Sequence, residues 1–164
     1  MKNIVLLMVF AFLMTAMATS IIDAQTTEPT KPDDAVVRQA WSAGPKLAPF
    51  QALRWREEVP EVRVNGTWYE LLGVNDLPAD QIISFAQSLD ERNWRKRIEE
   101  DLPAVLILMG HPPGPVVKLS LKNLESGAQQ TLDNVQMTEK NRQLIQTARR
   151  TASEPTTQPG TTGL

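Results

Sequence analysis

The dipeptide Asn65-Gly66 constrains the fold of this chain more than any other feature. It stands between residues 62–64 and 67–71, two short segments in which apolar and polar side chains alternate. Alternation at period two is typical of a strand with one buried face. Asn-Gly is the favoured pair for a two-residue hairpin loop, because both positions need positive φ. The sequence therefore predicts an antiparallel hairpin at this point.

Further strands are expected on both sides of this hairpin. Apolar and basic residues alternate over residues 53–56, and Pro60 is expected to separate that run from the hairpin. Alternation returns over residues 117–122. A turn at residues 125–127 then leads into one more expected strand at residues 129–135. These segments predict a sheet of about five strands.

Two helical segments are expected in the middle of the chain. Apolar residues at three- and four-residue spacing predict an amphipathic helix over residues 79–89. Ser88 begins a Ser-Leu-Asp-Glu capping box, so a second helix is expected to start near this residue. That helix should continue to Met109, with Pro103 kinking it or restarting it as a first-turn residue. Gly110 is well placed to end it.

Two more helices are expected at the ends of the domain. Asp33 is a suitable N-cap for a short helix that Gly44 would end, and Thr138 is a suitable N-cap for a last helix through about Arg150. Strands and helices therefore come in blocks and do not alternate regularly. This order predicts an α+β domain, with a small mixed sheet of about five strands and two to four helices.

The core of this domain is expected to depend on hydrophobic packing alone. The chain has no cysteine and so no disulfide. Trp55, Trp68 and Trp94 are expected to anchor the core, because a buried tryptophan removes a large apolar surface from water. The basic residues 95–97 are expected to pair with the acidic residues 99–101 at i, i+4, which is typical of a solvated helix face.

The N-terminus has the pattern of a cleavable export signal. Lys2 precedes an uncharged apolar run of 11 residues at 4–14, and small residues follow it. Such a run is well short of the roughly 20 residues that span a bilayer. We expect cleavage after Ala18 or Ala24 and export to the periplasm or the medium, with no stable membrane anchor left afterwards.

The rest of the chain divides by composition. Residues 1–24 form the expected signal peptide, and residues 25–46 form a polar linker with the short helix. Residues 47–150 form the expected domain. Residues 151–164 are rich in Thr, Pro and Gly without apolar periodicity, which predicts a disordered tail. The net charge of −2 gives no strong field for nucleic acid or an anionic membrane, so neither is an expected partner. The oligomeric state is left open.

No catalytic residue, cofactor or metal ion is expected. His111 is the only histidine, and it stands in a Gly-His-Pro-Pro-Gly turn with no nucleophile motif. Lys118 and Ser120 point the same way on a predicted strand, which indicates a solvated face and not a Ser–Lys site. A zinc site needs several Cys or His ligands. A small hydrolase-like enzyme that uses His111 is therefore only the third interpretation.

Part of the chain resembles PDZ domains. Residues 69–78 (Tyr-Glu-Leu-Leu-Gly-Val-Asn-Asp-Leu-Pro), followed by the expected helix over residues 79–89, resemble the strand–turn–helix segment of this family. A Pro-Gly turn, the strand after it and a final hairpin also resemble the family, at residues 113–114, 116–121 and 127–132. The resemblance covers roughly residues 69–133.

This resemblance implies a non-enzymatic module that binds a protein or peptide segment. A PDZ ligand adds as a strand beside the sheet, against a helix. On this chain, Gln81, Ser84 and Ser88 would then line the ligand groove. A Gly-containing loop that could hold a C-terminal carboxylate is missing before Leu53, so internal extended segments are the expected ligands. The alternative is a structural or accessory envelope protein without peptide capture.

Overall fold

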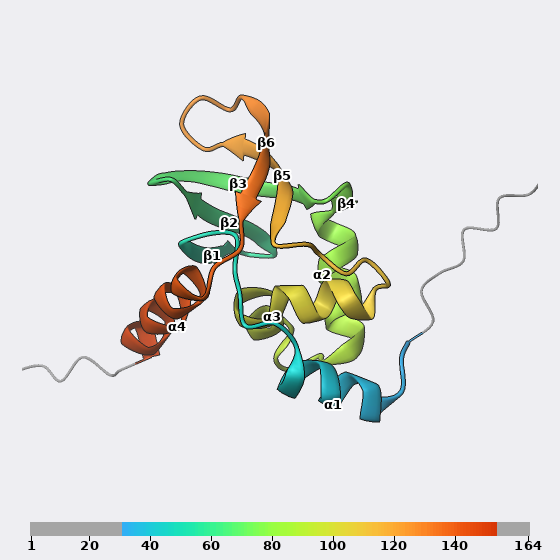
Figure 1. Cartoon of the computed structure of the whole chain (residues 1–164). Helices are drawn as coiled ribbons and strands as arrows, with labels where there is room; N and C mark the ends of the chain where they lie inside the picture. Colours follow the sequence, from blue (N-terminus) through green and yellow to red (C-terminus); the bar gives the residue numbers. More distant parts are fainter. Residues whose placement is uncertain (1–30, 154–164) are drawn as a thin grey trace, which may run out of the picture.

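The computed structural model describes residues 31–153 (Figure 1). The expected signal peptide and residues 154–164 of the expected tail lie outside the described residues. Within residues 31–153, no helix is long and apolar enough to cross a membrane. The elements follow in the order α1 (Asp34–Ala43), β1 (Ala52–Arg56), β2 (Val59–Val64), β3 (Thr67–Val74), β4 (Leu77–Pro78), α2 (Ala79–Leu89), α3 (Trp94–Leu108), β5 (Val116–Asn123), β6 (Gln129–Gln136) and α4 (Glu139–Ser153).

The strands form one antiparallel sheet in the order β1-β2-β3-β5-β6, and the short β4 pairs with the end of β3. The helices gather on one side of this sheet, below it in the view of Figure 1. The predicted α+β class is confirmed, with a small sheet and four helices in the part of the chain that the structure describes.

The hairpin between β2 and β3 forms as predicted. Asn65 and Gly66 have φ values of 50° and 84°, and Val64 pairs with Thr67 directly across the turn. The role expected for Pro60 is wrong, because this residue lies inside β2, opposite Trp55 of β1. Pairing of β2 with β3 begins one residue later, at Glu61. The missing N–H of Pro60 therefore removes no hydrogen bond to β3.

The core lies between the sheet and the helices. Alternate residues of the central strands point into it, as the period-two pattern predicts, and helices α2 and α3 supply apolar side chains from the other side. The largest fully buried side chains include Phe50, Val62, Leu119, Leu121, Ile98, Leu102 and Leu106.

The three tryptophans differ in their environments. Trp94 is buried, and Trp55 packs against it edge-to-face with ring centroids 4.9 Å apart. The prediction for Trp68 is wrong, because this side chain lies half-buried on the opposite face of the sheet. It is paired there with Arg63 and lies under the guanidinium of Arg54. Tyr69, the next residue, takes the core position in β3.

The capping box predicted from Ser88 does not form. Helix α2 continues through Ser88, whose hydroxyl donates to the carbonyl of Phe85 at 2.7 Å. Helix α3 instead begins at Trp94, after a turn in which the Asp90 carboxylate accepts from the main-chain N–H of Asn93 at 3.1 Å. Local hydrogen bonding by Asp90 therefore replaces the predicted cap.

The predicted break near Pro103 is confirmed. Asp101 has φ −130° and ψ 25°, which interrupts the helical backbone, and Pro103 follows in the first turn of the second part. The helix ends as predicted, since Gly110 has φ 81° and the N–H of His111 reaches back to the carbonyl of Leu106 at 2.9 Å.

The terminal helices begin at the predicted caps. The Asp33 carboxylate accepts from the N–H of Ala35, and the Thr138 hydroxyl accepts from the N–H of Asn141 at 3.1 Å. Helix α4 continues to Ser153, so the first residues of the expected tail are helical.

Candidate functional site

The segment before β1 and the residues just after β6 meet at an isolated bridge between Ala48 and Thr138. The N–H of Ala48 donates to the carbonyl of Thr138 at 3.1 Å, and the N–H of Thr138 donates back at 3.0 Å. Beyond this bridge the chain segments diverge, since β1 pairs with β2 and β6 pairs with β5. A wedge therefore opens between β6 and the β1–β2 side of the sheet, which we call the seam.

The seam contains an open pocket of about 460 Å³. This volume lies within the range of about 300–1,000 Å³ that is usual for ligand sites. The pocket is bounded by the segment before β1, the β2–β3 turn, strand β6 and the start of α4. Its lining residues are Pro49, Gln51, Val64, Asn65, Leu132, Asp133, Asn134, Val135, Gln136, Thr138, Lys140 and Asn141.

The main chain of Gln136 faces this pocket. In antiparallel pairing, successive residues turn their N–H and C=O groups to opposite edges of the strand. Met137 donates to Pro115, toward β5, whereas Thr138 bonds to Ala48 across the seam. Gln136 lies directly opposite Val116 and two residues before Thr138. Its N–H and C=O therefore point to the same edge as those of Thr138, where the pocket lies.

Strand β6 carries a bulge beside the pocket. The register shifts between Val117 and Leu119, and the partners of these residues on β6 are Val135 and Leu132. Asn134, within the shift, has φ 58°. Bulges at a sheet edge redirect side chains and interrupt pairing, and they often lie beside functional sites. The bulge limits any added strand to a short stretch of the β6 edge.

Half of the residues that line the pocket are uncharged and polar. A carboxamide carries both donors and acceptors, which matches the chemistry of a peptide group. Two carboxamides are fixed by the main chain, since Asn141 donates to the carbonyl of Ala48 at 3.2 Å and Gln51 accepts from the N–H of Gly66 at 3.2 Å. Asp133 and Lys140 carry opposite charges, so the lining residues have no net charge. The five carboxamide residues are Gln51, Asn65, Asn134, Gln136 and Asn141.

The residues predicted to line a groove lie elsewhere. Gln81, Ser84 and Ser88 are exposed on α2, and the elements on which α2 packs include α3, β3 and β4. Both edges of β3 are paired, to β2 and β4 on one side and to β5 on the other. Beside α2, the edge available to a ligand strand is the two-residue β4, whose Pro78 has no N–H. Binding at these residues stays a prediction.

The residues considered for catalysis do not converge. His111 is exposed just after the end of α3. Lys118 forms an ion pair with Asp76, and Ser120 lies opposite Thr131 in the sheet. Among residues 31–153, no group of three His, Cys, Asp or Glu side chains is arranged to hold a metal ion.

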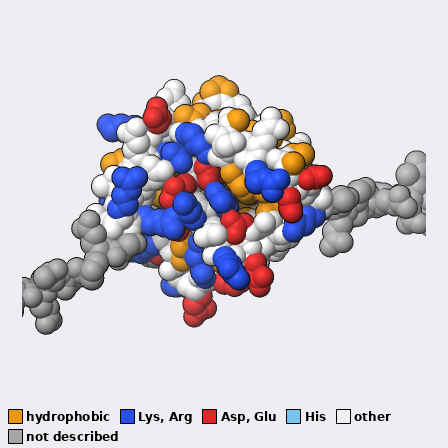
Figure 2. All heavy atoms as spheres, turned by 90° about the horizontal axis from the view of Figure 1, so that it is seen from below, with side chains coloured by type: hydrophobic (Ala, Val, Ile, Leu, Met, Phe, Trp, Pro, Cys, Tyr) orange, Lys and Arg blue, Asp and Glu red, His pale blue; other side chains and the backbone are white. Residues whose placement is uncertain are grey.

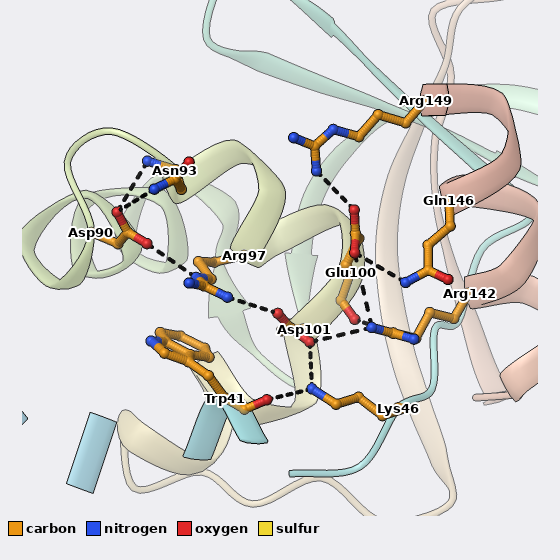
Figure 3. A network of polar contacts seen from close by, with 10 residues as sticks. All are labelled: Trp41, Lys46, Asp90, Asn93, Arg97, Glu100, Asp101, Arg142, Gln146 and Arg149. Carbon is orange, nitrogen blue, oxygen red and sulfur yellow. Dashed lines mark hydrogen bonds and ion pairs between the residues drawn. The ribbon is translucent and has the colours of Figure 1, made fainter. Parts of the chain in front are cut away.

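The acidic residues of α3 join the helices in a network (Figure 3). Asp101 is buried and pairs with Lys46 at 2.8 Å and with Arg97 at 3.2 Å, the latter as predicted at i, i+4. Glu100 contacts α4 instead of a neighbouring turn, since it accepts from Gln146 at 3.0 Å and from Arg149 at 2.7 Å. The network is an internal connection between helices and not the solvated face that was predicted.

Charges of both signs cover the helical side of the molecule. Figure 2, seen from below, shows Lys and Arg side chains with Asp and Glu side chains between them at the centre of this face.

Glu99, the third acidic residue of α3, accepts from the indole N–H of Trp55 at 2.7 Å. Burial raises the pKa of Glu99, and the hydrogen bond from Trp55 opposes this shift. These contacts serve to pack helices against each other and against β1.

No protein-family model, curated protein or solved structure matches this chain. The PDZ resemblance of residues 69–133 therefore stays a prediction.

Proposed function

We propose that this domain binds an extended segment of another protein by strand addition in the seam. The observation that carries the proposal is the main chain of Gln136, whose N–H and C=O face an open pocket lined by carboxamides. Strand addition draws its affinity from main-chain hydrogen bonds, and pockets for alternate side chains supply its specificity. The seam provides both.

The bridge between Ala48 and Thr138 supports this proposal. It is a single antiparallel pair, and the two chain segments diverge beyond it without further pairing. A ligand strand would continue the pairing at Gln136. Its side chains would contact the apolar part of the lining, which includes Val64, Leu132 and Val135. Because the bulge at Asn134 ends the regular edge, we expect a short ligand segment and an affinity on the order of micromolar.

An accessory protein without peptide capture is the alternative. A covered strand edge would favour it, whereas the outer edge of β6 is paired with no other strand among residues 31–153. Together with the expected export signal, the open edge favours a partner in the cell envelope or outside the cell. The pocket gives no support to the hydrolase interpretation, because His111 is not among the residues that line it.

A pair of substitutions at one position tests the proposal. Gln136→Pro removes the N–H that faces the seam and leaves the bonds between β5 and β6 intact, because that N–H points away from β5. Gln136→Ala removes the side chain and keeps the N–H. Peptides selected from an array on the wild-type chain should bind Gln136→Ala nearly as well as wild type. They should bind Gln136→Pro at least about tenfold more weakly in a titration.

Two results would contradict the proposal. Equal binding by Gln136→Pro and wild type would show that the β6 edge is not used. Loss of binding in Ser84→Trp, with Gln136→Pro unaffected, would move the site to the predicted groove on α2. Far-ultraviolet circular dichroism of each variant establishes that the fold is kept.

A further inference from the structure

The face of the sheet opposite the core carries a row of charged residues. Strand register places Arg54 opposite Glu61, Glu61 opposite Glu70, and Glu70 opposite Lys122. Directly opposed residues of neighbouring strands point to the same side of a sheet. This row therefore crosses β1, β2, β3 and β5. We call the surface that it forms the charged face, which comprises Arg54, Arg56, Glu61, Arg63, Trp68, Glu70 and Lys122.

The two acids of the charged face are already occupied. Glu61 is only 5% exposed, and it accepts from the Nε of Arg54 at 2.7 Å and from the Nε of Arg56 at 2.8 Å. The hydrogen bond from Arg56 holds the pKa of Glu61 below its usual value, so this carboxylate stays ionised. Glu70 lies between Arg56 and Lys122, at 3.8 and 3.5 Å. Both acids therefore act as internal partners of the bases.

Three of the four bases, in contrast, reach into solvent. The side chains of Arg54, Arg56 and Lys122 are 56%, 61% and 43% exposed. Glu61 takes the Nε of both arginines, and Glu70 lies 3.8 Å from the Nη2 of Arg56, so the terminal N–H groups of Arg54 have no acidic partner on this face. Arg54 is also held over the ring of Trp68, with its guanidinium carbon 4.2 Å from the ring centroid. Donors fixed in this way lose little entropy when a ligand binds.

We infer that the charged face is a docking surface for an acidic protein segment. Its four bases outnumber its two acids, on a chain whose net charge is −2. The terminal N–H groups of the arginines suit the two oxygens of an Asp or Glu carboxylate, and Lys122 provides a second cation along the row. The half-buried ring of Trp68 supplies an apolar contact beside them, as aromatic residues do at interface centres.

A nucleic acid fits this surface less well than a peptide does. Binding a phosphate backbone draws on many cations spread over a groove or stripe. Here the two carboxylates lie inside the row, and the net charge of the chain adds no long-range attraction. Discrete carboxylates spaced along a polypeptide match a few fixed arginines better. This inference does not depend on binding in the seam.

The test is a titration of the folded chain with a synthetic peptide of alternating Glu and Ser residues. Its counterpart with Gln in place of Glu is the neutral probe. We expect binding of the acidic peptide alone, weakened by added salt. Lys122→Gln should reduce its affinity roughly fivefold, as should Arg54→Gln. Arg38→Gln is the matched control, because it removes one exposed positive charge from α1 and should change nothing.

Four outcomes would overturn the inference. They are absent binding of the acidic peptide, equal binding of the neutral peptide, equal weakening by Arg38→Gln, and tighter binding of a single-stranded oligonucleotide of equal charge. Arg54→Gln leaves Glu61 with one partner and can unfold the chain. If thermal unfolding shows that it does, the affinity of Lys122→Gln decides the test. Repeating the titration with Gln136→Pro separates this surface from the seam, since this variant should still bind the acidic peptide.

Discussion

At the scale of single residues, Trp68 and Tyr69 show how one step along a strand decides burial. Tyr69 pairs with Val62 and enters the core, whereas Trp68 pairs with Arg63 and faces outward. Successive side chains of a strand point to opposite faces, so only one of two adjacent aromatics can enter the core on one side of the sheet. The hydrophobicity of tryptophan favours burial, but the alternation of Tyr69 and Leu71 with polar residues outweighs it.

Glu99 is the residue with the clearest consequence for pH dependence. Burial raises its pKa, despite the opposing hydrogen bond from Trp55. A carboxyl with a raised folded-state pKa stabilises the fold fully below its unfolded-state pKa of about 4.3, and this contribution is lost as pH rises through the folded-state value. Glu99→Gln is neutral at every pH and retains an acceptor for Trp55. We therefore expect its stability relative to wild type to increase as pH rises from about 4 to 7.

Urea unfolding at several pH values measures this difference. Glu61→Gln is an informative control, because the hydrogen bond from Arg56 lowers the pKa of Glu61. The stabilisation by Glu61 is present above its unfolded-state pKa and is lost as pH falls through the folded-state value. Its variant should therefore lose stability relative to wild type as pH rises. A pH-independent difference between Glu99→Gln and wild type would contradict the prediction.

At the scale of elements, the β2–β3 hairpin depends on the conformation of its turn. Gly66 has φ 84°, and a Cβ placed on it would meet no neighbouring atom. The cost of Gly66→Ala is therefore conformational and not steric. We expect a loss of about 1 kcal/mol in the free energy of unfolding, measured by chemical denaturation.

Gly114→Ala is the matched control for this substitution. Gly114 does not have positive φ, and a Cβ there would lie 3.8 Å from the carbonyl oxygen of Val116, an ordinary contact. The substitution should be neutral or slightly stabilising, since it reduces the freedom of the unfolded chain. Equal losses for the two variants would show that the turn conformation does not explain the effect.

Elements with a strong local signal were predictable from sequence. The period of apolar residues predicted α2 from residue 79 to 89, and the cap residues Asp33 and Thr138 located the starts of the terminal helices. The start of α3 and the position of Pro60 were wrong. In both cases tertiary context decides, because Ser88 stays within a packed helix and Pro60, opposite Trp55 of β1, lies just outside the stretch of β2 that pairs with β3.

At the scale of the whole molecule, the seam could not be predicted from local patterns. It exists because Ala48 bonds to Thr138, far away in the sequence, while the adjacent strands β1 and β6 pair with different neighbours. The one signal in the sequence is the density of Asn and Gln from residue 129 to 143, which is unusual for a strand and a helix that contribute to a core. The PDZ resemblance predicts a groove beside α2, whereas the pocket lies beside β6.

The attachment of α4 depends on Arg142 in the network of Figure 3. Its Nε donates to the main-chain carbonyl of Glu100 at 2.6 Å, and its Nη2 lies 3.6 Å from the carboxylate of buried Asp101. A helix of this length has little stability in water on its own. Removing the guanidinium leaves the part-buried carbonyl of Glu100 without this donor and weakens the compensation of the buried Asp101 carboxylate. We therefore expect Arg142→Ala to lower the free energy of unfolding by about 2 kcal/mol.

Hydrogen exchange gives this prediction its regional signature. Amide protons of α4 should exchange faster in Arg142→Ala than in wild type, whereas those of β3, paired on both edges, should change only as far as global stability changes. Gln143→Ala is the control on the same helix. Its exposed side chain bonds only the neighbouring turn, at Glu139, so its effect should stay within about 0.5 kcal/mol. Equal effects of the two substitutions would mean that α4 is held by Ile145 and its apolar contacts and not by the network.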